Sequence, residues 1–304
     1  MRALVRDLAL ALRERVLPQL GSHAGRVHEA AAAGGDVTFA IDADAEQALE
    51  AFLAERAPDV AVYSEDRGRV EPGGGARAVL VVDPIDGTRP ALAGLESCCV
   101  SVAAAPLDGE PAMGDVTVGC VVEIPSGRVF LAERGAGVVE GPPVRLSRNE
   151  RIERMFWSHG FRGRPARPIA EVLGDLIDAS SVGGATFELG SAAFELTRVV
   201  TGQLDACVEP GPRLVDEVPG MRAEFERVGG GAVLNNSPYD LAAATLILEE
   251  AGAVITDAYG RSLAGCPLLG SGHEFQMSVV ASGNPALQAA ILQMLDGGFR
   301  RVSG

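Results

Sequence analysis

The sequence of 304 residues is poor in basic side chains, with 26 Lys and Arg against 41 Asp and Glu and a formal net charge of −15. No basic run is longer than the pair Arg300-Arg301. A protein of this charge repels a phosphate backbone except at a local basic patch. We therefore expect no nucleic-acid duplex as a partner. A site for an anionic substrate would need metal cations to reverse the local charge.

Cysteines and long apolar runs are also scarce. The five cysteines show no CxxC spacing, which excludes a recognisable disulfide framework or zinc site and makes a reducing cytoplasm the expected location. No stretch reaches 18 uncharged apolar residues, so we expect no membrane span. Charges at Arg6, Asp7 and Arg13 interrupt the apolar core that a signal peptide would need.

The first half of the chain combines helices with short strands. Helical spacing of apolar residues predicts amphipathic helices over residues 4–16 and 43–57. Short β-rich runs follow at residues 78–82, 98–105, 116–123 and 128–133. These runs predict an antiparallel or mixed sheet backed by helices.

The second half alternates helix and strand from residue 165 onward, which favours an α/β layer. Residues 210–238 interrupt this alternation with four prolines and a triple glycine. We expect a long loop there, with at most one helical turn near residues 221–227. Loops of that length are usually functional or mobile. No linker separates the halves, so we expect two intimate subdomains, residues 1–150 and 151–304.

The most informative motif is an apolar run that ends in Asp83-Pro-Ile-Asp86-Gly-Thr88. Pro84 keeps Asp83 extended, and Gly87 lets the main chain pass close to a ligand. The alternative interpretation is an ordinary Asp-Pro turn at a strand end, with Asp86 and Gly87 as turn residues.

Other carboxylates favour a site over a simple turn. Glu65 and Asp66 end another β-run, and Asp36 and Asp42 lie six residues apart just before the second predicted helix. Asp240 stands at the start of the helix predicted over residues 241–251, where an N-cap is its commoner role. Clustered acids repel one another unless cations lie between them, and oxygen ligands favour Mg²⁺. We therefore predict a cluster of two or three Mg²⁺ ions.

Together these segments resemble the inositol monophosphatase family, which shares a superfamily with fructose-1,6-bisphosphatase and the bisphosphate nucleotidases. The resemblance covers most of the chain. It depends, in chain order, on residues 64–66, 83–88, 134–137, 141–147, 189–193, 201–206, 239–243 and 249–257. It implies an α/β (α+β) protein built as a layered α-β-α-β-α sandwich of the inositol monophosphatase and sugar phosphatase type, and a homodimer.

The resemblance also implies metal ligands. Glu65, Asp83 and the backbone carbonyl of Ile85 would hold a first Mg²⁺. Asp83, Asp86 and Asp240 would hold a second. A third, weaker ion would touch Glu65 through water.

Catalytic and substrate contacts are implied in the same way. Glu65 and the Thr88 hydroxyl would orient the attacking water, with Asp42 beside the third ion. The backbone N–H groups of Gly87 and Thr88 would meet the phosphate at a helix start. The implied contacts to substrate or phosphate are Asp86, Gly87, Thr88, Ala192 and Glu209.

Three departures from the family limit what can be inherited. Arg89-Pro90 follows Thr88 where Thr-Asn-Phe is common, and Tyr239 stands where Trp is usual. Glu209 and Asp240 are 31 positions apart, whereas the inositol enzymes have only a few residues between the matching acids. Inositol specificity therefore does not follow from the resemblance.

Residues 210–238 are accordingly assigned to the wall of the substrate pocket. Their arginines could reach a second anionic group on a larger substrate. Those arginines are Arg213, Arg222 and Arg227. A second basic group, Arg162, Arg164 and Arg167, could meet substrate, although we expect it on a solvated face. Trp157 and Cys98-Cys99 are expected in the core.

The leading interpretation is a Mg²⁺-dependent, lithium-sensitive phosphomonoesterase acting on a small polyol, sugar or nucleoside phosphate. The alternatives within enzymes are a bisphosphate nucleotidase and a fructose-1,6-bisphosphatase. From another class, the chain could be a non-catalytic homologue that binds a phosphorylated metabolite and regulates a partner through residues 210–238.

Overall fold

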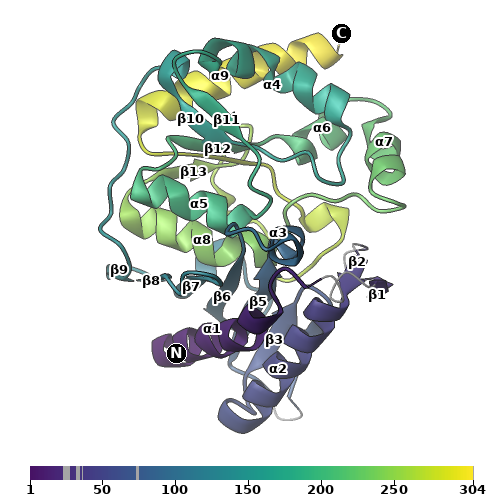
Figure 1. Ribbon diagram of the computed structural model, residues 1–304, viewed down its shortest axis with the longest axis vertical. Coiled ribbons are helices and arrows are strands. Elements are labelled where there is room, and N and C mark those ends of the chain that lie inside the picture. The colour runs from purple at the N-terminus through teal and green to yellow at the C-terminus, as the bar shows by residue number, and fades with distance from the viewer. Residues whose placement is uncertain (23–27, 32–34, 36, 73–74, 304) are drawn as a thin grey trace.

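The computed structural model describes residues 1–22, 28–31, 35, 37–72 and 75–303 (Figure 1). The α-helices are α1 (Arg2–Val16), α2 (Ala40–Arg56), α3 (Thr88–Ala93), α4 (Ala166–Ser180), α5 (Ala192–Thr201), α6 (Gly211–Glu217), α7 (Met221–Val228), α8 (Pro238–Ala251) and α9 (Pro285–Ser303). The strands are β1 (His28–Ala31), β2 (Val37–Phe39), β3 (Ala61–Ser64), β4 (Gly68–Val70), β5 (Ala78–Asp86), β6 (Cys99–Pro106), β7 (Val118–Glu123), β8 (Val129–Glu133), β9 (Gly137–Glu140), β10 (Phe156–Ser158), β11 (Ala185–Phe187), β12 (Ala206–Glu209), β13 (Val254–Thr256) and β14 (Val279–Ser282).

The strands form two mixed sheets and one short ribbon. The larger sheet has the order β4-β3-β5-β6-β7-β8-β9, in which β3 and β5 are parallel and the other neighbours antiparallel. The smaller sheet has the order β11-β10-β12-β14-β13, with β10 parallel to both of its neighbours. β1 and β2 pair as a separate antiparallel ribbon.

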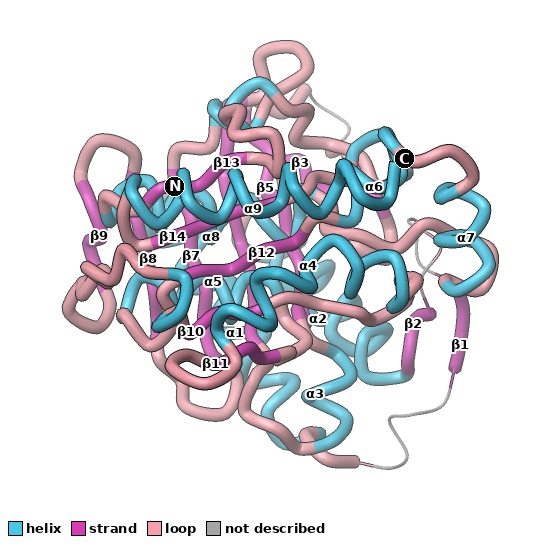
Figure 2. The backbone as a smooth tube through the Cα atoms, turned by 90° about the horizontal axis from the view of Figure 1, so that it is seen from above, coloured by secondary structure: helices cyan, strands magenta, loops and turns pink. Residues whose placement is uncertain are grey.

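Helices cover both sheets and also separate them. α1 and α2 pack on one face of the larger sheet, and α5 and α8 lie between its other face and the smaller sheet (Figure 1). Figure 2 shows α4 and α9 lying over the outer face of the smaller sheet, where they close a third core. The predicted α-β-α-β-α sandwich is therefore confirmed.

β5 lies at the centre of this arrangement. Because successive side chains of a strand point to opposite faces, Val79 and Val81 join the core beneath α5 and α8, whereas Leu80 and Val82 join the core beneath α1 and α2. Burial on both faces explains why the sequence of β5 is continuously apolar. It also fixes the position of the polar residues at the end of the strand.

The second helix begins earlier than the sequence pattern predicts. α2 starts at Ala40, so Asp42 lies in its first turn and not before the helix. The backbone N–H of Phe39 donates to Asp42 Oδ2 at 2.9 Å, and this bond satisfies one of the amides that a helix start leaves without a partner. Asp36 lies outside the described residues.

The expectation of a loop with one helical turn over residues 210–238 is wrong. The segment forms α6 and α7, and it buries the side chains of Leu214 and Phe225 completely in the third core. Its prolines and glycines lie at helix ends: Pro212 is in the first turn of α6, and Gly220 precedes α7 with a positive φ of 82°. These residues delimit helices here and do not prevent them.

The division at residue 150 stays a prediction. The strands of the larger sheet all precede this residue, and those of the smaller sheet all follow it. However, α5 and α8 belong to the second half and complete the core of the first.

Within the described part of the chain, no helix combines the length and the apolar character that a membrane crossing needs.

Replacing Phe225 with alanine tests whether α7 is part of the core. We expect the free energy of unfolding to fall by about 3–5 kcal/mol, because the change leaves a cavity in the third core. Arg227→Ala on the same helix removes an exposed side chain and should change it by less than about 0.5 kcal/mol. Urea denaturation followed by circular dichroism measures both. Equal values for the two variants would contradict a core role.

Candidate active site

Three carboxylates converge where β5 ends and α8 begins. One oxygen from each of Asp83, Asp86 and Asp240 lies within 4.8 Å of the others. In a regular strand, residues three positions apart point to opposite faces. The pairing of β5 with β6 shifts register between Asp83 and Asp86, so this irregularity lets both side chains face one cavity.

The start of α5 holds Asp86 in place. The Ser191 hydroxyl donates to Asp86 Oδ2 at 2.7 Å, and the backbone N–H of Ala193 donates to the same oxygen at 2.6 Å. The N–H of Ala192 donates to Oδ1 at 3.2 Å. A helix N-terminus favours a negative charge in this position. Asp86 thereby connects the central strand of the larger sheet to a helix from the second half of the chain.

Asp240 has a capping role, although it is not the N-cap. Ser237 is the N-cap of α8, and its backbone N–H donates to Asp240 Oδ2 at 2.6 Å. Asp240 thus lies three residues into the helix, with its carboxylate turned back toward the helix start. This orientation places it next to Asp83 and Asp86.

A threonine links α2 to the end of β5. The Thr88 hydroxyl lies 3.1 Å from Asp42 Oδ1 and 3.1 Å from the carbonyl oxygen of Ile85, two acceptors for its single proton. Asp42 is buried, so the structure brings an acid from a distant helix to the β5 motif. The cavity beside these residues is lined by Glu65, Asp83, Ile85, Asp86, Gly87, Thr88, Arg89, Arg162, Gly190 and Asp240.

Burial and mutual repulsion perturb the acids of this cavity. Burial raises the pKa of Asp83 well above its usual range, and the charges of Glu65, Asp86 and Asp240 raise it further. Burial also raises the pKa of Asp86. Desolvation and the charge of Asp86 raise the pKa of Asp240 to about 8. Because the protein alone does not stabilise all these charges, the cluster favours bound cations.

Gly87 is required where β5 turns into α3. Its φ is +89°, a conformation that other residues rarely adopt. A Cβ atom there would lie 2.7 Å from the carbonyl oxygen of Ser97 and 2.8 Å from Cβ of Ser191. Only glycine therefore lets the backbone of the motif pass this close to its neighbours.

A second cavity adjoins the first and contains the other implied substrate contacts. Ala192 and Glu209 line it, together with Asn235 and Asn236 from the end of the 210–238 segment. Glu209 forms a buried ion pair with Arg164. Sequence reasoning missed the two asparagines, and the only signal for them was their position shortly before Asp240.

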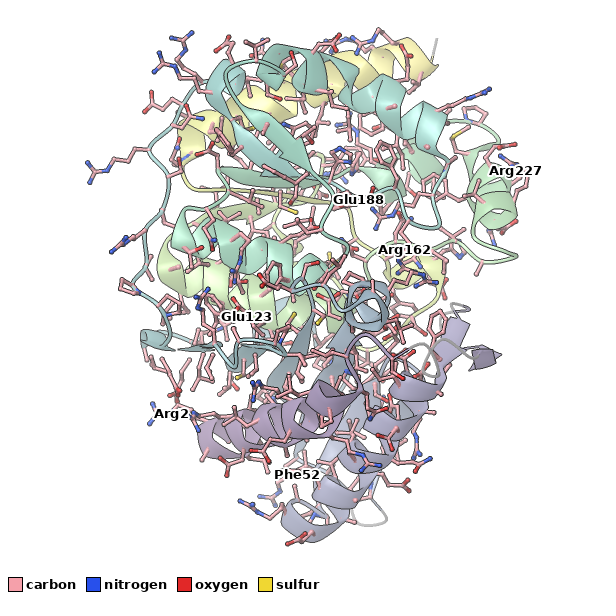
Figure 3. The ribbon with its side chains drawn as sticks, viewed as in Figure 1. Arg2, Phe52, Glu123, Arg162, Glu188 and Arg227 are labelled. Carbon is pink, nitrogen blue, oxygen red and sulfur yellow. The ribbon has the colours of Figure 1, made fainter. Side chains whose placement is uncertain are left out.

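The expectation of a solvated face is wrong for Arg164, whereas Arg162 and Arg167 are exposed as expected. Arg162 lines both cavities, and Figure 3 shows it close to Glu188 between the two sheets. Arg164 is buried and donates to the carbonyl oxygen of Leu234 and to Asn236 Oδ1 at 3.1 Å each. Trp157, Cys98 and Cys99 are buried as predicted.

The three arginines of the 210–238 segment do not face the site. Arg213 is buried, with its guanidinium 4.1 Å from the centre of the Phe299 ring. Arg222 and Arg227 pair with Glu226 and Glu224 on α7 itself, and Figure 3 shows Arg227 extending outward. None of the three is among the described residues that line either cavity. They therefore cannot contact a second anionic group of a substrate bound there.

The layered fold and the buried acidic cluster are those of a phosphoric monoester hydrolase. The chain belongs to the inositol monophosphatase family, because a sequence model of that family matches residues 2–296. The family resemblance and the activity class that the sequence predicts are thereby confirmed.

Individual relatives bear two kinds of name. The chain is 28% identical to a fructose-1,6-bisphosphatase/inositol-1-monophosphatase of Methanothermobacter thermautotrophicus over 278 residues, covering 87% of this chain and 85% of the relative. It is 30% identical over 200 residues to a Nus factor SuhB of Xylella fastidiosa, covering 65% and 68%.

Solved structures share the fold at low identity. The extragenic suppressor protein suhB of Bartonella henselae superimposes with a TM-score of 0.72 at 19% identity, covering 97% of this chain and 98% of that one. The inositol monophosphatase of Anabaena superimposes with a TM-score of 0.68 at 18% identity, covering 97% and 95%.

The raised pKa of Asp240 predicts how the metal-free protein responds to pH. Its pKa is about 8 in the folded protein and about 3.9 in an unfolded chain. Between these values the folded state binds more protons, so stability falls as the pH rises from about 4 to about 8. Asp240→Asn should reduce this loss between about pH 5 and pH 8 by more than about 1 kcal/mol.

Urea denaturation in the presence of EDTA measures this slope. Asp59→Asn, which changes an exposed acid that lines neither cavity, should leave the slope as in the unmodified protein. A slope that is unchanged in Asp240→Asn would show that the carboxylate is ionised in the folded protein without metal.

Proposed function

We propose that the protein is a Mg²⁺-dependent phosphomonoesterase that hydrolyses a small phosphorylated polyol, sugar or nucleoside. The observation that carries this proposal is the convergence of carboxylate oxygens from Asp83, Asp86 and Asp240 within 4.8 Å. Glu65 lines the same cavity. Four acids in one cavity repel a phosphate dianion unless their charge is compensated.

The donor set fits Mg²⁺. All of the candidate ligand atoms are oxygens, which this hard cation prefers. The sequence contains no lysine that could serve as a phosphate clamp instead. Glu65, Asp83 and the Ile85 carbonyl would hold one ion, and Asp83, Asp86 and Asp240 a second. When bound, these ions would compensate the charge of the phosphate and lower the pKa of a water.

A third ion is proposed on the same grounds at Glu65, with Asp42 nearby. Asp42 Oδ2 already accepts the Phe39 N–H, and Oδ1 accepts the Thr88 hydroxyl. Its negative charge is therefore fixed in position before any ligand arrives. This arrangement suits a site that is weaker than the other two.

Thr88 is the group best placed to orient the attacking water. Its hydroxyl has Asp42 and the Ile85 carbonyl as acceptors for its own proton, which leaves a lone pair of the oxygen to accept a hydrogen bond from water. Glu65 would accept the other proton of that water. The route needs no side-chain nucleophile, and burial raises the pKa of the nearby Cys98 to about 12, which keeps its thiol protonated.

The second cavity suits the alcohol part of the substrate. Glu209 is fixed by Arg164 and supplies acceptors, while the amides of Asn235 and Asn236 supply both donors and acceptors. Such a set favours a hydroxyl-rich group. Since both asparagines come from residues 210–238, we keep the end of this segment as part of the pocket wall and as a determinant of substrate choice.

A sugar bisphosphate is the second candidate substrate. Arg162 lines both cavities and places a positive charge beside the alcohol part of the site. Some relatives of the chain are named fructose-1,6-bisphosphatase/inositol-1-monophosphatase. Phosphate release from inositol phosphates and from sugar bisphosphates, compared by kcat/KM, separates the two candidates.

Metal removal is the direct test of the proposed reaction. Hydrolysis of an aryl phosphate should stop in excess EDTA and return with Mg²⁺. Asp83→Asn should lower kcat by at least about 10³-fold, because it removes a ligand shared by two ions. Asp108→Asn, an exposed acid, is the control and should keep full activity. Full activity in EDTA would rule out the metal-dependent route.

The role of Thr88 is tested by two substitutions. Thr88→Ala should lower kcat by about 10²-fold with little change in KM, because the hydroxyl orients water mainly in the transition state. Thr88→Ser keeps the hydroxyl and should retain most of the rate. Steady-state kinetics at saturating Mg²⁺ gives both values. If the two variants lose activity equally, the residue only packs.

A further inference from the structure

A separate cavity lies between α2 and the edge of the larger sheet. Its volume is about 330 Å³, and Figure 1 shows α2 running beside β3 here. The walls are mostly apolar and include Leu49, Leu53, Ala57, Val60, Val62 and Val70. None of these residues lines the two cavities of the active site. A cavity of this size and composition suits a small organic ligand.

A buried carboxylate faces this apolar space. Glu46 lines the cavity and is only 3% exposed. Among the described residues, neither of its oxygens has a partner with good hydrogen-bond geometry. The Ser64 hydroxyl and the backbone N–H of Asp66 approach the carboxylate and offset the effect of burial on its pKa only in part. The nearest cation is Arg67, whose Nε is 3.7 Å from Glu46 Oε2, and Arg67 also pairs with the exposed Glu50 at 2.9 Å. An ionised group buried with so little compensation is costly.

The charge balance of the cavity favours a cationic ligand. Of the three acids that line it, Glu71 pairs with Arg69 at 2.5 Å and Glu50 pairs with Arg67 at 2.9 Å, which leaves Glu46 as the acid with the weakest compensation. The net charge of −15 for the whole chain acts in the same direction. Burial raises the pKa of Glu46, which reflects how poorly its charge is compensated when nothing is bound. A cation beside the carboxylate would supply the missing donors.

We propose that this cavity binds a small primary ammonium ion with an apolar body, with the ammonium group against Glu46 and the hydrocarbon against the aliphatic walls. The apolar part contributes through the area removed from water. The ammonium group donates to the two carboxylate oxygens, and the Ser64 hydroxyl, which also lines the cavity, lies among the polar groups available to it. The site is distinct from the metal cluster and takes a ligand of opposite charge to a phosphate ester.

The test uses hexylammonium as the probe and hexan-1-ol as its uncharged counterpart, both measured by isothermal titration calorimetry on the full chain. Hexylammonium should bind with a saturable isotherm and at least about tenfold more tightly than the alcohol, because only the amine pairs with the carboxylate. Equal affinities would overturn the proposal, as would the absence of saturable hexylammonium binding below about 10 mM.

Two variants locate the binding. Glu46→Gln should weaken hexylammonium binding at least about tenfold while leaving hexan-1-ol binding unchanged, since it removes the charge and keeps the shape. Glu55→Gln makes the same change at an exposed position of α2 that does not line the cavity, and should have no effect. If both variants lose affinity equally, the probe responds only to surface charge and the site is wrong.

A third variant keeps the proposal testable if Glu46→Gln does not fold. Ala54 is exposed at the rim of the cavity, so Ala54→Trp should block the entrance while leaving Glu46 intact. Binding of hexylammonium should then be lost, whereas hydrolysis of an aryl phosphate should continue at the normal rate. Undiminished binding in Ala54→Trp would contradict the location.

Discussion

The repulsion between buried carboxylates at the end of β5 is the constraint on which the rest of the structure depends. Each of these acids accepts a hydrogen bond from a backbone N–H near its own position or from an adjoining helix: Asp42 from Phe39, Asp83 from Ile85, Asp86 from Ala192 and Ala193, and Asp240 from Ser237. Such bonds favour the ionised form, whereas burial opposes it, and burial has the larger effect on Asp83, Asp86 and Asp240. The fold therefore holds the acids in position but leaves their charge for a ligand to compensate.

Much of the fold and of the acidic cluster could be predicted from the sequence, because the signals are local. The apolar run before Asp83 predicts a strand, and the spacing from Asp83 to Thr88 is set by one short motif. Strand ends and helix starts can meet at one edge of a sheet. The order of strands and helices along the chain is therefore enough to predict that Glu65 and Asp240 lie beside that motif. What local patterns could not give is exact helix bounds, as the early start of α2 shows for Asp42.

The remaining errors concern contacts between residues far apart in the chain. Composition made residues 210–238 look irregular, yet Phe225 finds a place in a core built by α4, α9 and the smaller sheet. Arg164 looked exposed because its partners, Glu209 and Asn236, are 45 and 72 positions away. The sequence pattern assigns Glu46 no role, and only the packing of α2 against the larger sheet buries it. The hydrophobic periodicity within one segment does not predict contacts between residues that are far apart in the chain.

Arg164 explains how the chain can carry a long insertion so close to its acidic cluster. Its guanidinium bonds to Glu209 at the start of the insertion and to the Leu234 carbonyl and Asn236 near the end. The two ends are thereby held together, and the helices between them pack away from the acids, with α7 at the edge of the molecule (Figure 1). Breaking a buried ion pair of this kind leaves an uncompensated charge and costs several kcal/mol. The insertion can therefore vary in its outer part without moving Asp240, whereas Asn236 is held by Arg164 in the wall of the second cavity.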